Sequence, residues 1–125
     1  MATGGMRTWY FPDGYLPEKT GTGSLEAHEA LMLLNVHEQP AQVKLDFYFD
    51  DREPVKDVAV SVPAERVLTL RLDHPGEIGG LRIPPMKQYA LRVRSDVPIV
   101  AQFGRLDTTQ TNLAYYMGIG FAENE

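Results

Sequence analysis

The chain has 125 residues, a formal net charge of −5, 43% hydrophobic residues and no cysteine. A chain of this length predicts one domain with its own core. The lack of cysteine excludes a disulfide-built scaffold, thiolate metal sites and cysteine nucleophiles. The acidic charge disfavours nucleic acid as a partner, because phosphate neutralisation dominates that affinity. With no secretory signal pattern and no apolar run of about 18–20 residues, we expect a soluble cytoplasmic protein without membrane insertion.

Alternation of apolar and polar residues, which is typical of half-buried β-strands, dominates the sequence. In the clearest run, 42–50, Val43, Leu45 and Phe47 are predicted to face a core and Asp46 to face solvent. In chain order, strands are predicted at 7–11, 28–36, 42–50, 57–62, 66–72, 89–95, 97–103 and 113–121.

Four of these segments are more continuously apolar than the others, namely 7–11, 28–36, 97–103 and 113–121. A strand that is apolar on both faces is usually covered on both faces. We therefore expect these segments to lie between sheets or between subunits.

Turn residues separate the predicted strands, which indicates a single all-β domain. About eight short strands with such spacing predict an antiparallel β-sandwich. We expect it to occupy residues 6–122, between a flexible N-terminus at 1–5 and an acidic tail at 123–125. Two longer connections stand out. The glycine-rich segment 14–25 is predicted to be a surface loop, and 75–86 to wrap a sheet edge or meet a partner.

The sequence shows no catalytic or metal-binding motif. His28, His37 and His74 lack a spacing that would place two of them on one strand face. His28 precedes Glu29 at the start of an apolar strand and fits a structural role better than a ligand-binding role. The acidic run at 50–53 lacks the ligand spacing of a calcium loop. The prediction is a non-enzymatic protein without cofactor or metal.

Three arginines on polar strand faces form a candidate docking surface. Arg92 and Arg94 share one strand face, and Arg71 lies on the polar face of another predicted strand. If these strands are neighbours, the arginines form a basic stripe that fits an acidic partner. The alternative is a solvated face on which they pair with carboxylates.

A second candidate surface follows the strand at 97–103. Arg105 and Asp107 project to the same side of an extended chain, which suits an ion pair or a ligand contact. The spacing of Asp107 and Gln110 fits a capped turn equally well. An aromatic ring beside such polar groups is a common way to hold a sugar. The candidate ligand-binding residues are Trp9, His28, Glu29, Gln102, Arg105 and Asp107.

Five blocks, in order along the chain, resemble the sensory rhodopsin transducer family. They are Trp9 with Gly14-Tyr15-x-Pro17; His28-Glu29 leading to Leu34-Asn35; Tyr48-x-Asp50 with Glu53-Pro54-Val55; Val62-Pro63-Ala64-x-Arg66; and Ser95-Asp96-Val97-Pro98-Ile99-Val100-x-Gln102 running into Arg105-Leu106-Asp107 and Gln110. The resemblance covers about residues 7–122. The segment 76–85 does not match the family pattern.

The resemblance implies a cytoplasmic β-sandwich of about eight strands that assembles as a homotetramer. It also implies a signalling role through protein contacts, with a membrane photoreceptor or another signalling protein as partner. The alternative function is binding of a small polar ligand of the carbohydrate type on the same scaffold.

Overall fold

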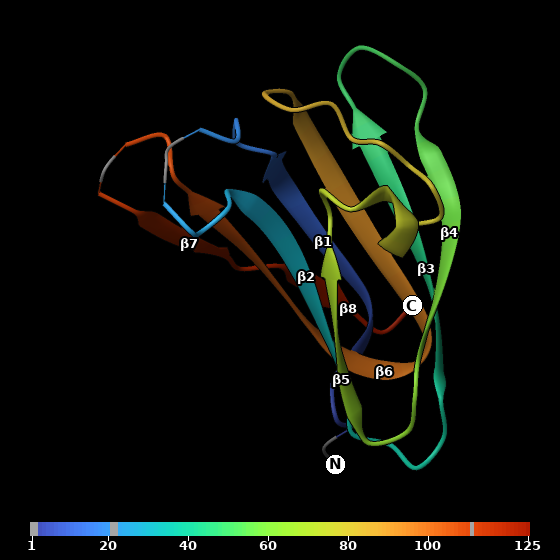
Figure 1. Ribbon diagram of the computed structural model, residues 1–125. Helices are drawn as coiled ribbons and strands as arrows, with labels where there is room; N and C mark the ends of the chain where they lie inside the picture. Colours follow the sequence, from blue (N-terminus) through green and yellow to red (C-terminus); the bar gives the residue numbers. More distant parts are fainter. Residues whose placement is uncertain (1–2, 21–22, 111) are drawn as a thin grey trace.

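The computed structural model describes residues 3–20, 23–110 and 112–125, which form an all-β fold (Figure 1). The strands are β1 (Met6–Tyr15), β2 (His28–Asn35), β3 (Ala41–Phe49), β4 (Val55–Val62), β5 (Arg66–Arg71), β6 (Gln88–Asp107), β7 (Ala114–Gly118) and β8 (Phe121–Glu123). The predicted all-β fold of about eight antiparallel strands is confirmed. In the described segments no helix is long and apolar enough to cross a bilayer. The predicted flexible N-terminus at 1–5 lies partly outside the described residues.

Several strand boundaries differ from the prediction: β1 continues to Tyr15 instead of ending at residue 11, and β4 begins at Val55 instead of residue 57. Two further differences change the number and order of the strands. The segments 89–95 and 97–103 belong to one 20-residue strand, β6. At its middle, Asp96 Oδ1 accepts a hydrogen bond from the Gln42 N–H (2.8 Å), which ties β6 to the start of β3. The predicted strand at 113–121 divides into β7 and β8. Gly120 stands between them, and a Cβ there would lie 2.7 Å from the Phe11 ring.

The long strand β6 bends near its middle and takes part in both layers of the sandwich (Figure 1). Its first half pairs with β3 and β1, and β4 and β8 extend this layer, which we call sheet A. Its second half pairs with β2 and β7, and β5 extends this layer, which we call sheet B. All pairings are antiparallel. One continuous strand therefore fixes the relative position of the two sheets.

The core lies between the sheets and contains the alternate apolar residues of each strand. Along β6, Leu91, Val93, Ile99 and Phe103 are at most 2% exposed. The predicted inward residues of β3 are buried as well, including Phe47 at 0%. Each large apolar side chain buried in this way contributes about 1.5–3 kcal/mol. The alternating pattern in the sequence therefore identified the core side of these strands correctly.

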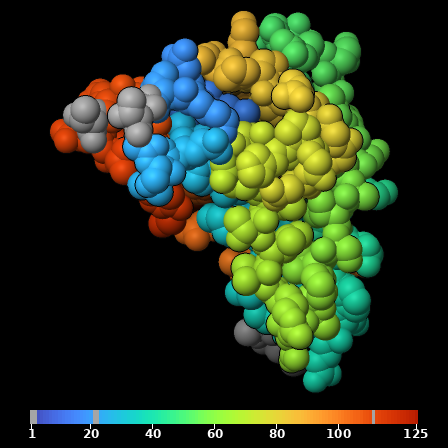
Figure 2. All heavy atoms as spheres, in the orientation of Figure 1, coloured from blue at the N-terminus to red at the C-terminus, as the bar shows by residue number. Residues whose placement is uncertain are grey.

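Two loops cover one end of the sandwich. The segment after β1 places Leu16 in the core, and the loop before β6 contributes Ile78 and Ile83. The two loops are tied together, because the Met86 N–H donates to the Leu16 carbonyl (2.9 Å). The segment after β1 (blue) and the 75–85 loop (yellow) adjoin in the space-filling view (Figure 2).

Candidate functional site

A buried carboxylate, that of Glu29, joins the two sheets at one end of the sandwich. The β2–β6 register places Glu29 opposite Arg105, and Glu29 Oε2 accepts from the Arg105 Nε–H (2.9 Å) and the Tyr15 N–H (2.9 Å). Its Oε1 accepts from the Tyr89 hydroxyl (2.7 Å). Gly14 permits this approach, because a Cβ there would lie 2.5 Å from the Tyr89 ring. Glu29 is 0% exposed and is held by residues of two strands, β1 and β6.

Arg105 is fixed from both sides by aromatic rings. Its guanidinium carbon lies 5.8 Å from the Tyr15 ring centroid and 5.0 Å from that of Tyr116, within the range of cation–π attraction. Its Nη2–H donates to the Asp13 carbonyl (3.0 Å), and the Tyr116 hydroxyl donates to the Asp13 carboxylate (3.1 Å). The arginine therefore occupies one orientation before any ligand arrives.

Opposing effects set the protonation of this cluster. Burial raises the pKa of Glu29 above its ordinary value, against hydrogen bonds from Tyr89, the Tyr15 N–H and Arg105 that lower it. Burial, together with the charge of Glu29, also raises the pKa of Tyr89 well above its usual range. The Arg105 guanidinium compensates the negative charge of the buried Glu29 carboxylate.

The cavity beside Arg105 is small. Its lining includes Asp13, Phe103 and Tyr116, and its volume is about 80 Å³. At about 30 Å³ for each water, it holds roughly three water molecules. The predicted ion pair of Arg105 and Asp107 is not among the ion pairs of the described residues, because Arg105 contacts Glu29 and Asp13 instead. The cavity next to Arg105 has no room for a monosaccharide. Ligand binding by these residues stays a prediction.

The other candidate ligand-binding residues lie elsewhere. Trp9 is partly buried and stacks on Phe11 of the core, with ring centroids 6.4 Å apart. Gln102 is exposed on the outer surface of sheet B, and His28 Nδ1 lies 2.7 Å from the Glu26 carbonyl oxygen. Asp107 accepts from the N–H of Thr109 (2.8 Å), which is the capped turn considered as its alternative role. The structure therefore brings Glu29 and Arg105 into contact, but not the remaining four.

Arg92 and Arg94 converge on Asp46 at the outer surface of sheet A. The prediction that Asp46 faces solvent is wrong, because the residue is 0% exposed beneath the two arginines. It accepts from Arg92 Nε (2.7 Å), from Arg94 Nε and Nη2 (both 2.8 Å), and from the Asp57 N–H (2.9 Å). Burial raises the pKa of Asp46, but hydrogen bonds from Arg94, the Asp57 N–H and Arg92 outweigh it and lower the pKa to about 2.

Arg71 lies in the other sheet. It is on β5, which pairs only with β2 among the described strands, whereas Arg92 and Arg94 lie on the first half of β6. The predicted basic stripe required the strands of the three arginines to be neighbours. They are not, so Arg71 does not form a stripe with Arg92 and Arg94. All three pair with carboxylates, as the alternative reading expected. Their use in docking a partner stays a prediction.

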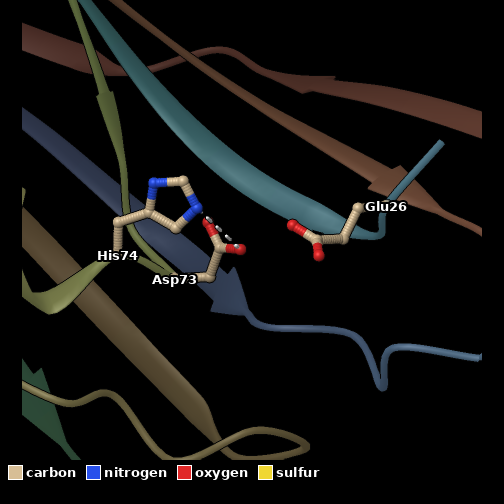
Figure 3. Close-up of side chains that lie close together, drawn as sticks. All are labelled: Glu26, Asp73 and His74. Carbon is tan, nitrogen blue, oxygen red and sulfur yellow. Dashed lines mark ion pairs between the residues drawn. The ribbon is translucent and has the colours of Figure 1, made fainter. Parts of the chain in front are cut away.

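One cluster has the residue types of a metal site. The ligand atoms of Glu26, Asp73 and His74 lie within 4.8 Å of one another (Figure 3). Two cations already occupy it: Lys19 Nζ lies 2.5 Å from Asp73 and 3.0 Å from Glu26, and Arg71 contacts both carboxylates. Burial raises the pKa of Asp73, but Arg71 and Lys19 more than offset it, leaving a pKa well below the usual range. We therefore describe this cluster as an ion-pair network.

The outer surface of sheet B carries several exposed apolar side chains, and we call it the apolar face. The register places Val67, Leu34 and Val100 side by side on β5, β2 and β6, while Tyr115 and Met117 lie on β7 opposite Leu106 and Gly104, further along β6. These five side chains are 39–64% exposed. Exposed apolar side chains that gather on one face indicate an interaction surface. The sequence signal was the two-sided apolarity of 28–36, 97–103 and 113–121.

The fold and surfaces define a small β-sandwich whose buried carboxylates, Glu29 and Asp46, are paired with arginines and whose apolar face is exposed. The chain matches the family model "Anabaena sensory rhodopsin transducer" over residues 4–122. It belongs to this sensory rhodopsin transducer family, as the sequence blocks predicted.

Two solved structures support the assignment. The crystal structure of Thermotoga maritima 1070 is 36% identical, with a TM-score of 0.84 over 96% of this chain and 97% of that one. The Anabaena sensory rhodopsin transducer is 28% identical, with a TM-score of 0.68 over 82% of this chain and 99% of that one. No curated protein matches the chain.

Proposed function

We propose that the protein is a non-enzymatic, cytoplasmic signalling module that acts through protein–protein contacts as a homo-oligomer. Its family and its structural similarity to the Anabaena sensory rhodopsin transducer support a signalling role. The apolar face is the observation that supports self-association of the protein. A tetramer is the assembly that we expect from the family resemblance.

The charge of the apolar face favours a second copy of the chain as its occupant. The molecule carries 17 acidic residues and a net charge of −5, so two copies repel over most of their surfaces. The outward residues of β5, β2, the second half of β6 and β7 include no aspartate or glutamate. Two copies therefore approach without contact between acidic groups on this face, and they remove apolar area from water.

Charge placed on the apolar face tests this assembly. We expect light scattering to give a multimeric mass for the wild type and a reduced mass for Val67→Asp and Leu34→Asp. The matched control is Ala59→Asp, which introduces the same charge on an exposed position of sheet A. A monomeric wild type contradicts the homo-oligomer. An unchanged mass for both variants excludes the apolar face as the interface.

The outer surface of sheet A remains open in such an assembly, and we propose it as the partner-docking surface. The side chains of Arg92 and Arg94 are 29% and 35% exposed there, and Lys44 lies beside Arg94 in the register. A membrane photoreceptor or another signalling protein with an acidic surface is the expected partner. Pull-down from native lysate with detergent-solubilised membranes should recover one specific protein with the wild type and less of it with Lys44→Glu. Consistent recovery of none contradicts the signalling role, independently of the assembly test.

A further inference from the structure

A cavity of about 300 Å³ lies beneath the two loops that cover one end of the sandwich. Its lining comes from three parts of the chain, namely the segment after β1, the residue before β2 and the loop between β5 and β6. The apolar lining residues include Leu16, Pro17, Ala27, Leu72, Ile83 and Pro85. A volume of this size lies at the lower end of the range for small-molecule sites.

The floor of this cavity is part of the hydrophobic core. Leu16, Ala27, Leu72 and Ile83 are each at most 5% exposed, so their positions are fixed by packing below the cavity. Prolines on the walls restrict the backbone further. A rigid, preformed apolar floor binds a ligand without a large ordering cost.

Four charged side chains stand around the cavity, and two of them compensate each other. Lys19 Nζ contacts Asp73 at 2.5 Å, and Asp73 is also held by Arg71. The other two, Glu18 and Arg82, are exposed, and neither has an ion-pair partner among the described residues. Arg82 is therefore the cation of the rim that is available to an incoming anion.

We propose that this cavity binds a small apolar carboxylate of about ten non-hydrogen atoms. This size follows from the cavity volume of about 300 Å³, which equals the volume of about ten water molecules at about 30 Å³ each. The apolar body of the ligand lies on the floor formed by Leu16, Leu72 and Ile83. Its carboxylate accepts charge-assisted hydrogen bonds from the Arg82 guanidinium. Lys19 contributes less, because Asp73 and Glu26 already hold its ammonium group. This binding is independent of self-association through the apolar face.

Titration of the ¹⁵N-labelled protein with 3-phenylpropionate tests the proposal. We expect amide resonances of 16, 18, 19, 27, 72–74 and 81–83 to shift, while those of the apolar face stay in place. The uncharged 3-phenylpropionamide should bind about five- to tenfold more weakly, because it lacks the negative charge that pairs with Arg82. The absence of shifts at millimolar ligand, or equal affinity for acid and amide, overturns the proposal.

Substitutions of the two oppositely charged rim residues, Arg82 and Glu18, sharpen the test and leave the core unchanged. Arg82→Gln should weaken binding of 3-phenylpropionate about five- to tenfold, and Arg82→Lys should restore part of it. Glu18→Gln should strengthen binding about twofold, since it removes a like charge from the rim. Arg66→Gln, an exposed arginine away from the cavity, is the control and should leave the affinity unchanged. If Arg82→Gln binds like the wild type, the assigned role of Arg82 is wrong and the proposal fails.

Discussion

The outer surfaces of the two sheets differ in chemistry although the same strand, β6, runs through both. On sheet A, the strands present Lys44, Asp46, Asp57, Arg92 and Arg94, and the arginines are paired with the aspartates. On sheet B, the corresponding outward positions are mostly apolar. The comparison shows that the outward residues of a β-sandwich determine what each surface can bind, while the inward residues specify the fold.

The physical consequences of the two surfaces are opposite. The charges of Asp46, Arg92 and Arg94 on sheet A are satisfied within one molecule, so this cluster is stable in water without a partner. The apolar face gains about 25 cal/mol for each Å² of apolar area that a second copy covers. Substitutions in the Asp46 cluster should therefore change the stability of the monomer, whereas substitutions on the apolar face should change association.

The largest effect is expected for Asp46→Asn. The substitution removes the charge that holds Arg92 and Arg94 and leaves two like charges close together over a buried amide. Loss of one partner of a buried ion pair typically costs about 3 kcal/mol. Urea unfolding followed by fluorescence of Trp9, which is the only tryptophan, measures the loss. It should be measured at one fixed protein concentration, because association also contributes to the apparent stability. A loss below about 1 kcal/mol would show that the arginines re-pair elsewhere.

Acid should reduce this contribution of sheet A. The pKa of Asp46 is about 2 in the folded protein, against an ordinary value of 3.8. Because the pKa is lower in the folded protein, ionised Asp46 stabilises the fold fully when the pH is above the ordinary pKa. This stabilisation is lost as the pH falls from the ordinary pKa to the pKa of the folded protein. The difference corresponds to about 2 kcal/mol. Wild type should therefore lose about 2 kcal/mol more than Asp46→Asn between about pH 4 and about pH 2. Parallel pH profiles for the two proteins would contradict this assignment.

The apolar face should respond through association instead. Tyr115 is 64% exposed on β7 and is not part of the hydrophobic core. Tyr115→Ser should leave the unfolding of the monomer nearly unchanged but weaken self-association about tenfold, as loss of an interface aromatic typically does. Analytical ultracentrifugation over a dilution series measures this constant. An unchanged constant would place the interface away from β7.

The sequence predicted the fold well because strand alternation is a local property. The inward positions of 42–50 and 89–95 are recognised from neighbouring residues alone, since each strand needs one apolar side. The continuity of β6 across Asp96 and Pro98 could not be predicted in this way. It depends on the hydrogen bond between Asp96 and the Gln42 N–H, which joins residues 54 positions apart.

The polar clusters were harder to predict for the same reason. Glu29 and Arg105 were singled out separately, but their contact depends on the β2–β6 register. The position of Asp46 depends on two arginines from another strand, so alternation alone placed it in solvent. The stripe with Arg71 required a strand order that the sequence does not specify. Two-sided apolarity did indicate the apolar face, because it reflects composition rather than pairing.

The smallest effect on stability is expected for Lys44→Glu, which separates the docking role of sheet A from its structural role. Lys44 is exposed beside Arg94 and, among the described residues, has no carboxylate within ion-pair distance. Reversal of its charge should change the free energy of unfolding by no more than about 0.5 kcal/mol. The mass in light scattering should stay that of the wild type, because the apolar face is untouched. Capture of an acidic partner should still fall, since a rim charge acts on association through long-range attraction. Capture equal to that of wild type would remove sheet A as the docking surface and leave the self-association proposal intact.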